Sequence, residues 1–367
     1  MKIPLIKPFM TQEVKDKVCE VLDSGYLTEG PVTHEFESLF REYVGCKHTI
    51  AVTSCTTGLE MALRCLGIGP GDEVVVPDYT YPATATAVCL VGAKAVIVDV
   101  CKDTMLIDPR ALEAAITPRT KAIIPVSIFG NPLNYDVIDA LKAKHSLLVI
   151  EDSACSIGAT FRGRKVGTFA DISVFSLHPR KFITTGEGGM VTTDNAAWAE
   201  WMESYKHFGM AVTTDRRESV VFERIGTNLK LSNVQAAIGL VQMRHIGELL
   251  SGRIACANRY IELLREHPAV RIPETTPGGL HSRQSFCVYV DNRDRVMRAM
   301  REAGIEVQIG TYSLTMHPAF SNGPLVQTAG VVTGSAYAFE HCLALPLFHG
   351  LTAEEQQVVV SKLTQEL

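Results

Sequence analysis

Hydrophobic residues in this chain recur with two periods, one typical of amphipathic helices and one typical of buried strands. Over residues 11–24, Val14, Val18 and Val21 fall on one helical face and Gly25 follows, which predicts an amphipathic helix ending at the glycine. Beyond this helix, helical and strand patterns alternate along the chain. The strand patterns are unbroken runs of Val, Ile and Leu, which indicates strands that are buried on both faces.

This alternation predicts an α/β fold in which helices cover a mostly parallel sheet. The glycine cluster Gly67–Gly71 lies between a predicted helix and the next strand. That order is wrong for a dinucleotide-binding turn, so we interpret the cluster as a helix end and a turn. We predict helices at residues 57–66, 108–116 and 135–144, and strands at residues 73–77, 95–99, 121–126, 147–152, 172–176 and 189–193.

The chain has 367 residues, enough for one large domain and a smaller one. The alternation ends near residues 245–255, and turn-rich sequence follows. We therefore predict a large domain over residues 1–247 and a smaller α+β domain over residues 248–367. In the second domain we predict a helix to about residue 266, a strand at residues 285–290 and helices at residues 293–303 and 353–364.

The composition and charge of the chain are typical of some classes of protein and argue against others. Apolar residues make up 46% of the chain and charged residues 20%, as in soluble globular proteins. The net charge of −5 and the lack of a dense Lys/Arg stripe argue against nucleic-acid binding. Ten scattered cysteines, without C-x-x-C pairs or metal-ligand spacing, indicate reduced thiols and predict no metal site. Without a signal peptide or an apolar span of membrane length, we expect a cytoplasmic protein with no membrane partner.

The strongest chemical signal comes from a lysine and an aspartate. Lys181 follows the predicted strand at residues 172–176 and precedes a polar, glycine-rich turn, and Asp152 ends the strand at residues 147–152. Ligands bind outside the carboxyl ends of parallel strands, where these side chains would meet. Most lysines near glycines are solvated surface residues, but this pair predicts a pyridoxal phosphate (PLP) site. Lys181 would form the Schiff base and Asp152 would keep the pyridine nitrogen protonated.

Hydroxyl groups near two strand ends suit the phosphate of such a cofactor. Ser54-Cys55-Thr56-Thr57 opens a helix directly after a predicted strand, and Ser176 ends another. Side-chain hydroxyls and backbone N–H groups at a helix N-terminus form an anion site. An ordinary N-cap is the alternative for Ser54, and the lysine and aspartate make the phosphate site the better interpretation.

Two further residues are candidates by position. Tyr81 follows a strand end, where an aromatic ring can stack on a pyridine face, although most such residues are only half-buried. His178 precedes Lys181 by three residues, so it would orient the lysine or share in proton transfer, although histidines are more often structural.

Several segments, in this order, resemble the DegT/DnrJ/StrS family of PLP-dependent sugar aminotransferases, and perosamine-synthase-like members in particular. The likeness runs from about residue 7 to the C-terminus. The segments that carry it are Gly67–Pro77 (GIGPGDEVVVP), Ile116–Pro125 (ITPRTKAIIP), Val149–Asp152 (VIED) and Phe175–Met190 (FSLHPRKFITTGEGGM).

The resemblance implies the aspartate-aminotransferase fold (fold type I), with a mostly parallel seven-stranded sheet in the large domain and a homodimer that shares its active sites. It implies that Asn228 reaches the phosphate across the dimer interface. It also places Tyr312, Lys230 and Gln308 at the substrate. The cofactor-binding set is then Ser54, Cys55, Thr56, Thr57, Tyr81, Asp152, Cys155, Ser176, Lys181 and Asn228, with Lys181, Asp152 and His178 as catalytic residues.

The chain departs from the family pattern at four positions. Cys55 stands where the family often has Gly, Ser127 where it has His, and Cys155 where it has Gln. The change at Cys155 puts the hydrogen bond to the cofactor's phenolic oxygen in doubt. Thr315 replaces a histidine in the segment that faces the substrate.

The expected reaction moves an amino group from L-glutamate, through the pyridoxamine form (PMP), to a keto-sugar. The 4-keto group of a nucleotide-linked deoxysugar is the preferred acceptor, with surface polysaccharide or glycan synthesis as the use. Alternatives are a 3-keto nucleotide sugar or a keto-cyclitol, a PMP-dependent sugar dehydratase, and a non-catalytic regulatory homologue. Lys181 argues against the dehydratase, because such relatives lack the Schiff-base lysine.

Overall fold

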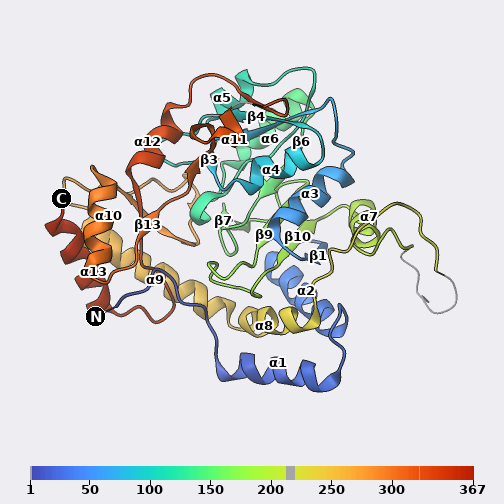
Figure 1. Ribbon diagram of the computed structural model, residues 1–367, viewed down its shortest axis with the longest axis horizontal. Helices are drawn as coiled ribbons and strands as arrows, with labels where there is room; N and C mark the ends of the chain where they lie inside the picture. Colours follow the sequence, from blue (N-terminus) through green and yellow to red (C-terminus); the bar gives the residue numbers. More distant parts are fainter. Residues whose placement is uncertain (1, 212–219, 322) are drawn as a thin grey trace.

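An eight-stranded sheet forms the centre of the protein, as the computed structural model shows for residues 2–211, 220–321 and 323–367 (Figure 1). In spatial order its strands are β1 (His48–Val52), β10 (Gly189–Thr193), β9 (Ile172–Ser176), β6 (Leu148–Asp152), β5 (Thr120–Ile123), β2 (Glu73–Pro77), β4 (Lys94–Val98) and β15 (Val326–Thr328).

The strands from β9 to β15 are parallel, and β10 runs antiparallel to both β9 and β1. The prediction of a mostly parallel sheet is confirmed. The expected number of seven strands is wrong, because β15 from the C-terminal part of the chain pairs with β4, with Val326 opposite Ala95. The three residues of β15 lie in a turn-rich stretch and show no strand pattern of their own.

Helices cover both faces of this sheet, which explains the unbroken apolar strands. Val74 and Val76 pack in one hydrophobic core, and Val75 packs in the core on the other face. The first core includes α3 (Cys55–Cys65), α4 (Ala83–Leu90) and α7 (Ala196–Lys206). The second includes α2 (Pro31–Val44), α5 (Pro109–Ala114), α6 (Tyr135–His145) and α8 (Asn233–Arg244), and α1 (Gln12–Ser24) packs on α8.

A third core lies beside the large sheet, at the left of Figure 1. Its three-stranded antiparallel sheet, called here the small sheet, has the order β12 (Phe286–Tyr289), β16 (Cys342–Leu345) and β13 (Gln308–Ile309). The helices α9 (Ile246–Leu264), α10 (Arg293–Glu302) and α13 (Ala353–Gln365) pack around it. The remaining elements are β3 (Tyr79–Thr80), β7 (Thr160–Phe161), β8 (Arg164–Lys165), β11 (Gly279–Leu280), β14 (Tyr312–Ser313), α11 (Pro318–Ser321), α12 (Thr333–His341) and two 3₁₀ turns, Ile128–Gly130 and Leu314–Met316.

Two segments cross the predicted domain division. Ile3 packs in the third core and pairs with Ile305, while β15 joins the large sheet. Helix α9 begins at Ile246, where the alternation was predicted to end, and runs through residue 248. The division into residues 1–247 and 248–367 stays a prediction.

Helix ends explain where the predicted and observed bounds differ. Thr11 caps α1 by accepting a hydrogen bond from the backbone N–H of Val14, and Gly25 ends it at φ +68°, as predicted. Helix α3 begins two residues earlier than predicted, because Ser54 and Thr57 form a capping box. Throughout the part of the chain that the structure describes, every helix is too short or too polar to cross a bilayer.

Candidate active site

Lys181 lies in the connection between β9 and β10, residues 177–188, which we call the lysine turn. Its Nζ donates a hydrogen bond to Sγ of Cys155 at 3.0 Å. Gln284 brackets the lysine: its side-chain amide donates to the carbonyl of Arg180 at 2.8 Å and accepts from the N–H of Phe182 at 3.1 Å. The side chain of Gln284 is buried, so the backbone on both sides of Lys181 is fixed.

Opposing effects act on the Lys181 amine. Burial lowers its pKa, but the neighbouring Cys155, Cys55 and Asp152 outweigh burial, and the pKa lies above its ordinary value. Asp152 and Lys181 therefore lie close enough to interact electrostatically.

Asp152 is a buried carboxylate at the end of β6. Its Oδ2 accepts a hydrogen bond from Oγ1 of Thr84 at 2.7 Å, and its Oδ1 accepts from the N–H of Ala154 at 3.1 Å. Burial raises its pKa, against those hydrogen bonds and the attraction of Lys181. A cation beside this carboxylate would favour its ionised form. Thr84 was missed from the sequence, because nothing in its local pattern marks a contact 68 positions away.

The N-terminus of α3 carries the predicted hydroxyl cluster. Ser54 Oγ accepts from the N–H of Thr57 at 3.1 Å, so the N-cap interpretation is correct for Ser54. An N-cap does not exclude anion binding, since Cys55 and Thr56 also belong to the first turn. Gly189 of β10 lies against this turn, and a Cβ there would stand 2.7 Å from the carbonyl carbon of Ser54. Ser176 ends the neighbouring strand β9.

Two aromatic side chains lie near each other, Tyr81 just after β3 and Tyr312 in β14. Tyr81 is 64% exposed, and its ring centroid lies 6.1 Å from that of Tyr312. Thr80 pairs with Tyr312 between β3 and β14, which brings the C-terminal segment to the Tyr81 side of the site. Gln308, four residues before Tyr312, accepts a hydrogen bond from Nη1 of Arg180 at 3.2 Å.

His178 helps to shape the lysine turn. Its Nδ1 accepts from the N–H of Arg180 at 3.2 Å, and its carbonyl accepts from the N–H of Lys181 at 2.8 Å. Burial lowers the pKa of His178, against the attraction of Glu187, so the ring is neutral at pH 7. The predicted orienting role fits these contacts.

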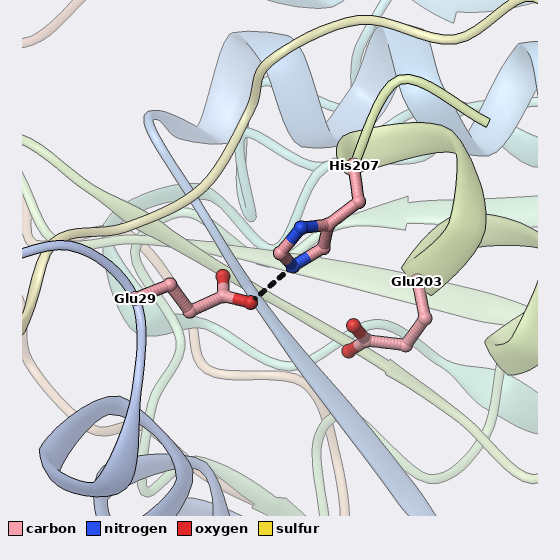
Figure 2. Close-up of side chains that lie close together, drawn as sticks. All are labelled: Glu29, Glu203 and His207. Carbon is pink, nitrogen blue, oxygen red and sulfur yellow. Dashed lines mark hydrogen bonds and ion pairs between the residues drawn. The ribbon is translucent and has the colours of Figure 1, made fainter. Parts of the chain in front are cut away.

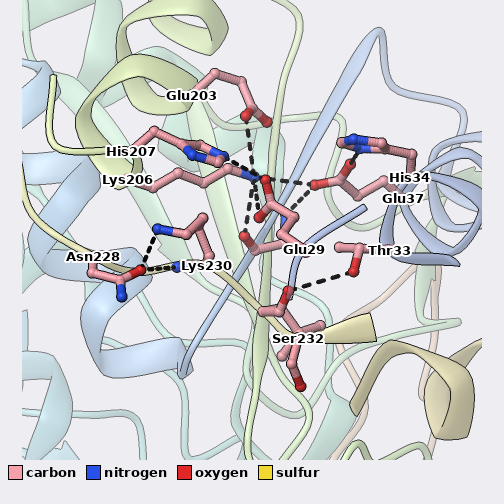
Figure 3. A network of polar contacts seen from close by, with 12 residues as sticks. Glu29, Thr33, His34, Glu37, Glu203, Lys206, His207, Asn228, Lys230 and Ser232 are labelled. Carbon is pink, nitrogen blue, oxygen red and sulfur yellow. Dashed lines mark hydrogen bonds and ion pairs between the residues drawn. The ribbon is translucent and has the colours of Figure 1, made fainter. Parts of the chain in front are cut away.

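Asn228 and Lys230 lie in a second polar group (Figure 3). Oδ1 of Asn228 accepts from Nζ of Lys230 at 2.6 Å, and Asn228 pairs with His207. The carbonyl of Leu229 accepts from the N–H of Thr53, so this segment lies beside the strand end that leads into Ser54.

Next to this segment is a set of ionisable groups, which we call the Lys206 cluster (Figure 3). Glu29, Glu37 and Lys206 are buried in it, and Glu203 and His207 are half-buried. The fully buried Nζ of Lys206 lies 3.1 Å from Glu29, 3.4 Å from Glu37 and 3.1 Å from Glu203. Sequence patterns missed this cluster, because its members come from two stretches, residues 29–37 and 203–207, that lie far apart in the sequence.

Part of the cluster has the composition of a metal site. Ligand atoms of Glu29, Glu203 and His207 lie within 4.8 Å of one another (Figure 2). However, the ammonium group of Lys206 forms ion pairs with both carboxylates. The protein therefore supplies its own cation where a metal ion would otherwise bind.

The residues around Lys181 fit PLP by their chemistry. They provide an amine, a buried carboxylate beside it, a hydroxyl-rich helix N-terminus and an exposed tyrosine ring. These groups match the aldehyde, the ring nitrogen, the phosphate and the ring face of the cofactor.

Known proteins resemble this chain over nearly its whole length. Residues 8–364 match the DegT/DnrJ/EryC1/StrS aminotransferase family. The chain is 36% identical to GDP-perosamine synthase of Caulobacter vibrioides over 100% of this chain and 98% of that protein. It is 32% identical to the spore coat polysaccharide biosynthesis protein SpsC of Bacillus subtilis, over 98% and 95%. The structure of Spr1654 from Streptococcus pneumoniae in its PLP form superposes with a TM-score of 0.93, at 28% identity, over 100% and 98% of the two chains.

Proposed function

The chain belongs to the DegT/DnrJ/EryC1/StrS aminotransferase family and is a PLP-dependent sugar aminotransferase of fold type I, and from this premise we propose its substrates and the roles of its residues. The amino donor is L-glutamate, and the acceptor is the 4-keto group of a nucleotide-linked deoxysugar. The observation that carries the proposal is the meeting of Lys181 and Asp152 at one sheet edge, in a chain 36% identical to a GDP-perosamine synthase.

Lys181 would hold the cofactor through Nζ, and its free amine would accept the proton that leaves the α-carbon of the donor. PLP supplies an electrophilic carbon for amines and a ring that takes up electrons when that proton leaves. Asp152 keeps the ring nitrogen protonated, and Thr84 and Ala154 fix the direction of its carboxylate. His178 orients the lysine turn through Arg180.

The phosphate binds at the N-terminus of α3, to Ser54, Cys55, Thr56 and Thr57. Ser176 contributes its hydroxyl from the end of β9. Asn228 of the second subunit of a homodimer would bind the same phosphate. Tyr81 would stack on one face of the ring.

Cys155 takes a role different from that of the family's glutamine. Its Sγ contacts Nζ of Lys181, so it places the amine rather than the phenolic oxygen of the cofactor. Tyr312, Lys230 and Gln308 line the route by which the keto-sugar enters.

Reduction with borohydride followed by peptide mass spectrometry tests the cofactor assignment. We expect a pyridoxyl group on Lys181, and its appearance on another lysine would overturn the assignment. Lys181→Ala should abolish turnover, while the exposed Lys15→Ala serves as the matched control and keeps full activity.

A substrate panel tests the finer part of the proposal. The enzyme is incubated with L-glutamate and UDP-, GDP- or dTDP-linked 4-keto- and 3-keto-sugars, and 2-oxoglutarate release is measured. We expect release with a 4-keto nucleotide sugar. Release only with 3-keto-sugars would contradict the proposed acceptor.

A further inference from the structure

We propose that Arg253 is a positioning residue for Lys181, and that together with Gln284 it ties the lysine turn to helix α9. Arg253 acts on the amine through the residues on either side of it, and not by contact with the reacting atoms. This inference deepens the proposed function and rests on Lys181 being the lysine that holds the cofactor.

Arg253 is a buried cation that backbone carbonyls hold in place. Its Nη1 donates to the carbonyls of Gln284 at 3.0 Å and Leu347 at 3.1 Å. Within the residues that the structure describes, no Asp or Glu oxygen lies within ion-pair distance of it, whereas the buried Arg293 pairs with Asp294 at 2.6 Å. Burial lowers the pKa of Arg253 to about 10, so the group is charged at pH 7. A buried charge without an opposite charge costs folding free energy, so stability alone is a poor explanation for this arginine.

The first link between Arg253 and the lysine turn runs through Gln284. The carbonyl of Gln284 accepts from Arg253, while its side-chain amide donates to the carbonyl of Arg180 and accepts from the N–H of Phe182. The side chain of Gln284 is only 5% exposed, so water competes little for these hydrogen bonds. The backbone on both sides of Lys181 is thereby tied to α9, which carries Arg253.

The second link is a direct contact between Arg253 and Phe182. The Cζ atom of Arg253 lies 5.1 Å from the centroid of the Phe182 ring, within the range of a cation–π interaction, and the ring is buried. Phe182 directly follows Lys181 in the chain. Two separate contacts from α9 and its partner Gln284 therefore converge on the residue next to the lysine.

The backbone beside Gln284 is strained. Arg283 has φ +57°, a left-handed conformation that costs free energy in a residue with a side chain. Its N–H donates to Nδ1 of His281 at 3.0 Å, and its carbonyl accepts from Nη1 of Arg253 at 3.4 Å. Arg253 thus holds the carbonyls of two consecutive residues in this turn. Strain of this kind persists where the surrounding structure fixes it, and here the turn places the Gln284 side chain against the lysine turn.

Half-reactions of the holoenzyme test the inference. Arg253→Met keeps a side chain of similar length but loses the charge and the donors. We expect the limiting rate with L-glutamate, followed by the absorbance of the cofactor, to fall roughly 10- to 100-fold, because a small displacement of the amine slows proton transfer. The glutamate concentration that gives half of this rate should stay near its wild-type value. Arg253→Lys keeps a cation and should recover part of the lost rate.

Arg293→Met is the matched control. Arg293 is also buried, donates to the carbonyl of Cys342 in the small sheet at 2.9 Å and lies over the ring of Phe339 at 5.9 Å. These contacts lie outside the lysine turn. We expect this variant to lose stability in thermal unfolding, as Arg253→Met does, but to keep the wild-type limiting rate.

Amide hydrogen exchange supplies a readout that needs no turnover. In Arg253→Met the N–H of Phe182, followed in the peptide that spans the lysine turn, should exchange faster than in wild type, and in Arg293→Met it should exchange at the wild-type rate. If Arg253→Met does not fold, Gln284→Met carries the same measurements, because it removes both hydrogen bonds to the lysine turn and leaves Arg253 in place.

Three outcomes would overturn the inference. An unchanged limiting rate in Arg253→Met would remove Arg253 from the positioning of the amine, and an equal loss in Arg293→Met would show a general effect of packing. A change confined to the half-saturating glutamate concentration would assign Arg253 to substrate binding. Failure of the proposed function is distinguishable, since borohydride would then mark a lysine other than Lys181 in the wild-type protein, while exchange of the Phe182 amide would still report on Arg253.

Discussion

At the scale of single residues, Asp152 shows how the fold prepares a group for chemistry. Burial raises the pKa of this carboxylate, and the hydrogen bonds from Thr84 and Ala154 and the attraction of Lys181 partly oppose that effect. A protonated pyridine nitrogen would lower the pKa of Asp152, because an opposite charge favours the ionised carboxylate.

Asp152→Asn should retain the fold and lose the chemistry. The amide keeps an acceptor for Thr84 but has no charge with which to hold a proton on the ring nitrogen. We expect kcat to fall on the order of 10³-fold, since the ring no longer takes up electrons effectively. Stopped-flow absorbance of the glutamate half-reaction measures this, and near-wild-type kinetics would contradict the role of Asp152. Circular dichroism checks the fold.

The proximity of Lys181 and Asp152 could be predicted, because Asp152 ends β6 and Lys181 follows the neighbouring parallel strand β9. Thr84 and Gln284 were not, since each acts through a contact distant in sequence, 68 positions for Thr84–Asp152 and 104 for Gln284–Arg180. Local patterns carry no information about such pairs. The residue type suggests which groups can react. The residues that hold those groups in place depend on tertiary packing.

At the scale of elements, the Lys206 cluster joins four parts of the large sheet's surroundings. Glu29 lies in the loop before α2, Glu37 in α2, and Glu203 and Lys206 in α7, and the N–H of Leu229 donates to the carbonyl of Lys206 at 3.2 Å. Lys206 also donates to the carbonyl of Ala51 in β1 at 3.4 Å. The cluster thereby fixes α7 and α2 against β1.

Lys206→Met should be strongly destabilising. It leaves three carboxylates in a buried region without their shared cation, a loss of about 3–5 kcal/mol for one partner of a buried ion pair. Urea unfolding measures it. Lys144→Met removes an exposed ion pair with Glu113 and serves as the control, with little change expected. Equal stability of the two variants would show that the cluster contributes nothing net.

The same cluster predicts a pH dependence of stability. Burial raises the pKa of Glu203 to about 7, against the attraction of Lys206, from an ordinary value of 4.5. Between these values the folded protein holds a proton that the unfolded chain releases, so this contribution to stability is lost as pH rises. Relative to wild type, Glu203→Gln should gain stability between pH 5 and pH 8, by at most a few kcal/mol. Thermal unfolding across that range measures it, and a difference that does not vary with pH would contradict the assignment.

At the scale of the whole molecule, the sequence patterns predicted the central strands well and the sheet's edge poorly. The central strands β2, β4, β6 and β9 are rich in apolar residues and mostly buried, and β2, β9 and β10 have their predicted bounds. Strand β15 has three residues, two of them exposed, so its pairing with β4 depends on the folded chain and not on its own sequence.

The dimer with shared sites is the assembly that the proposed role of Asn228 requires. If Lys181 of one subunit and Asn228 of its partner serve one site, a heterodimer of Lys181→Ala and Asn228→Ala subunits has one doubly defective site and one intact site. Equal mixing with free exchange makes half of the dimers mixed, so activity should return to about a quarter of the wild-type value. If Asn228 serves its own subunit, no intact site forms, and the mixture stays as inactive as its parents. Unfolding and refolding the two variants together, with each variant refolded alone as the control, decides between these arrangements by a single activity measurement.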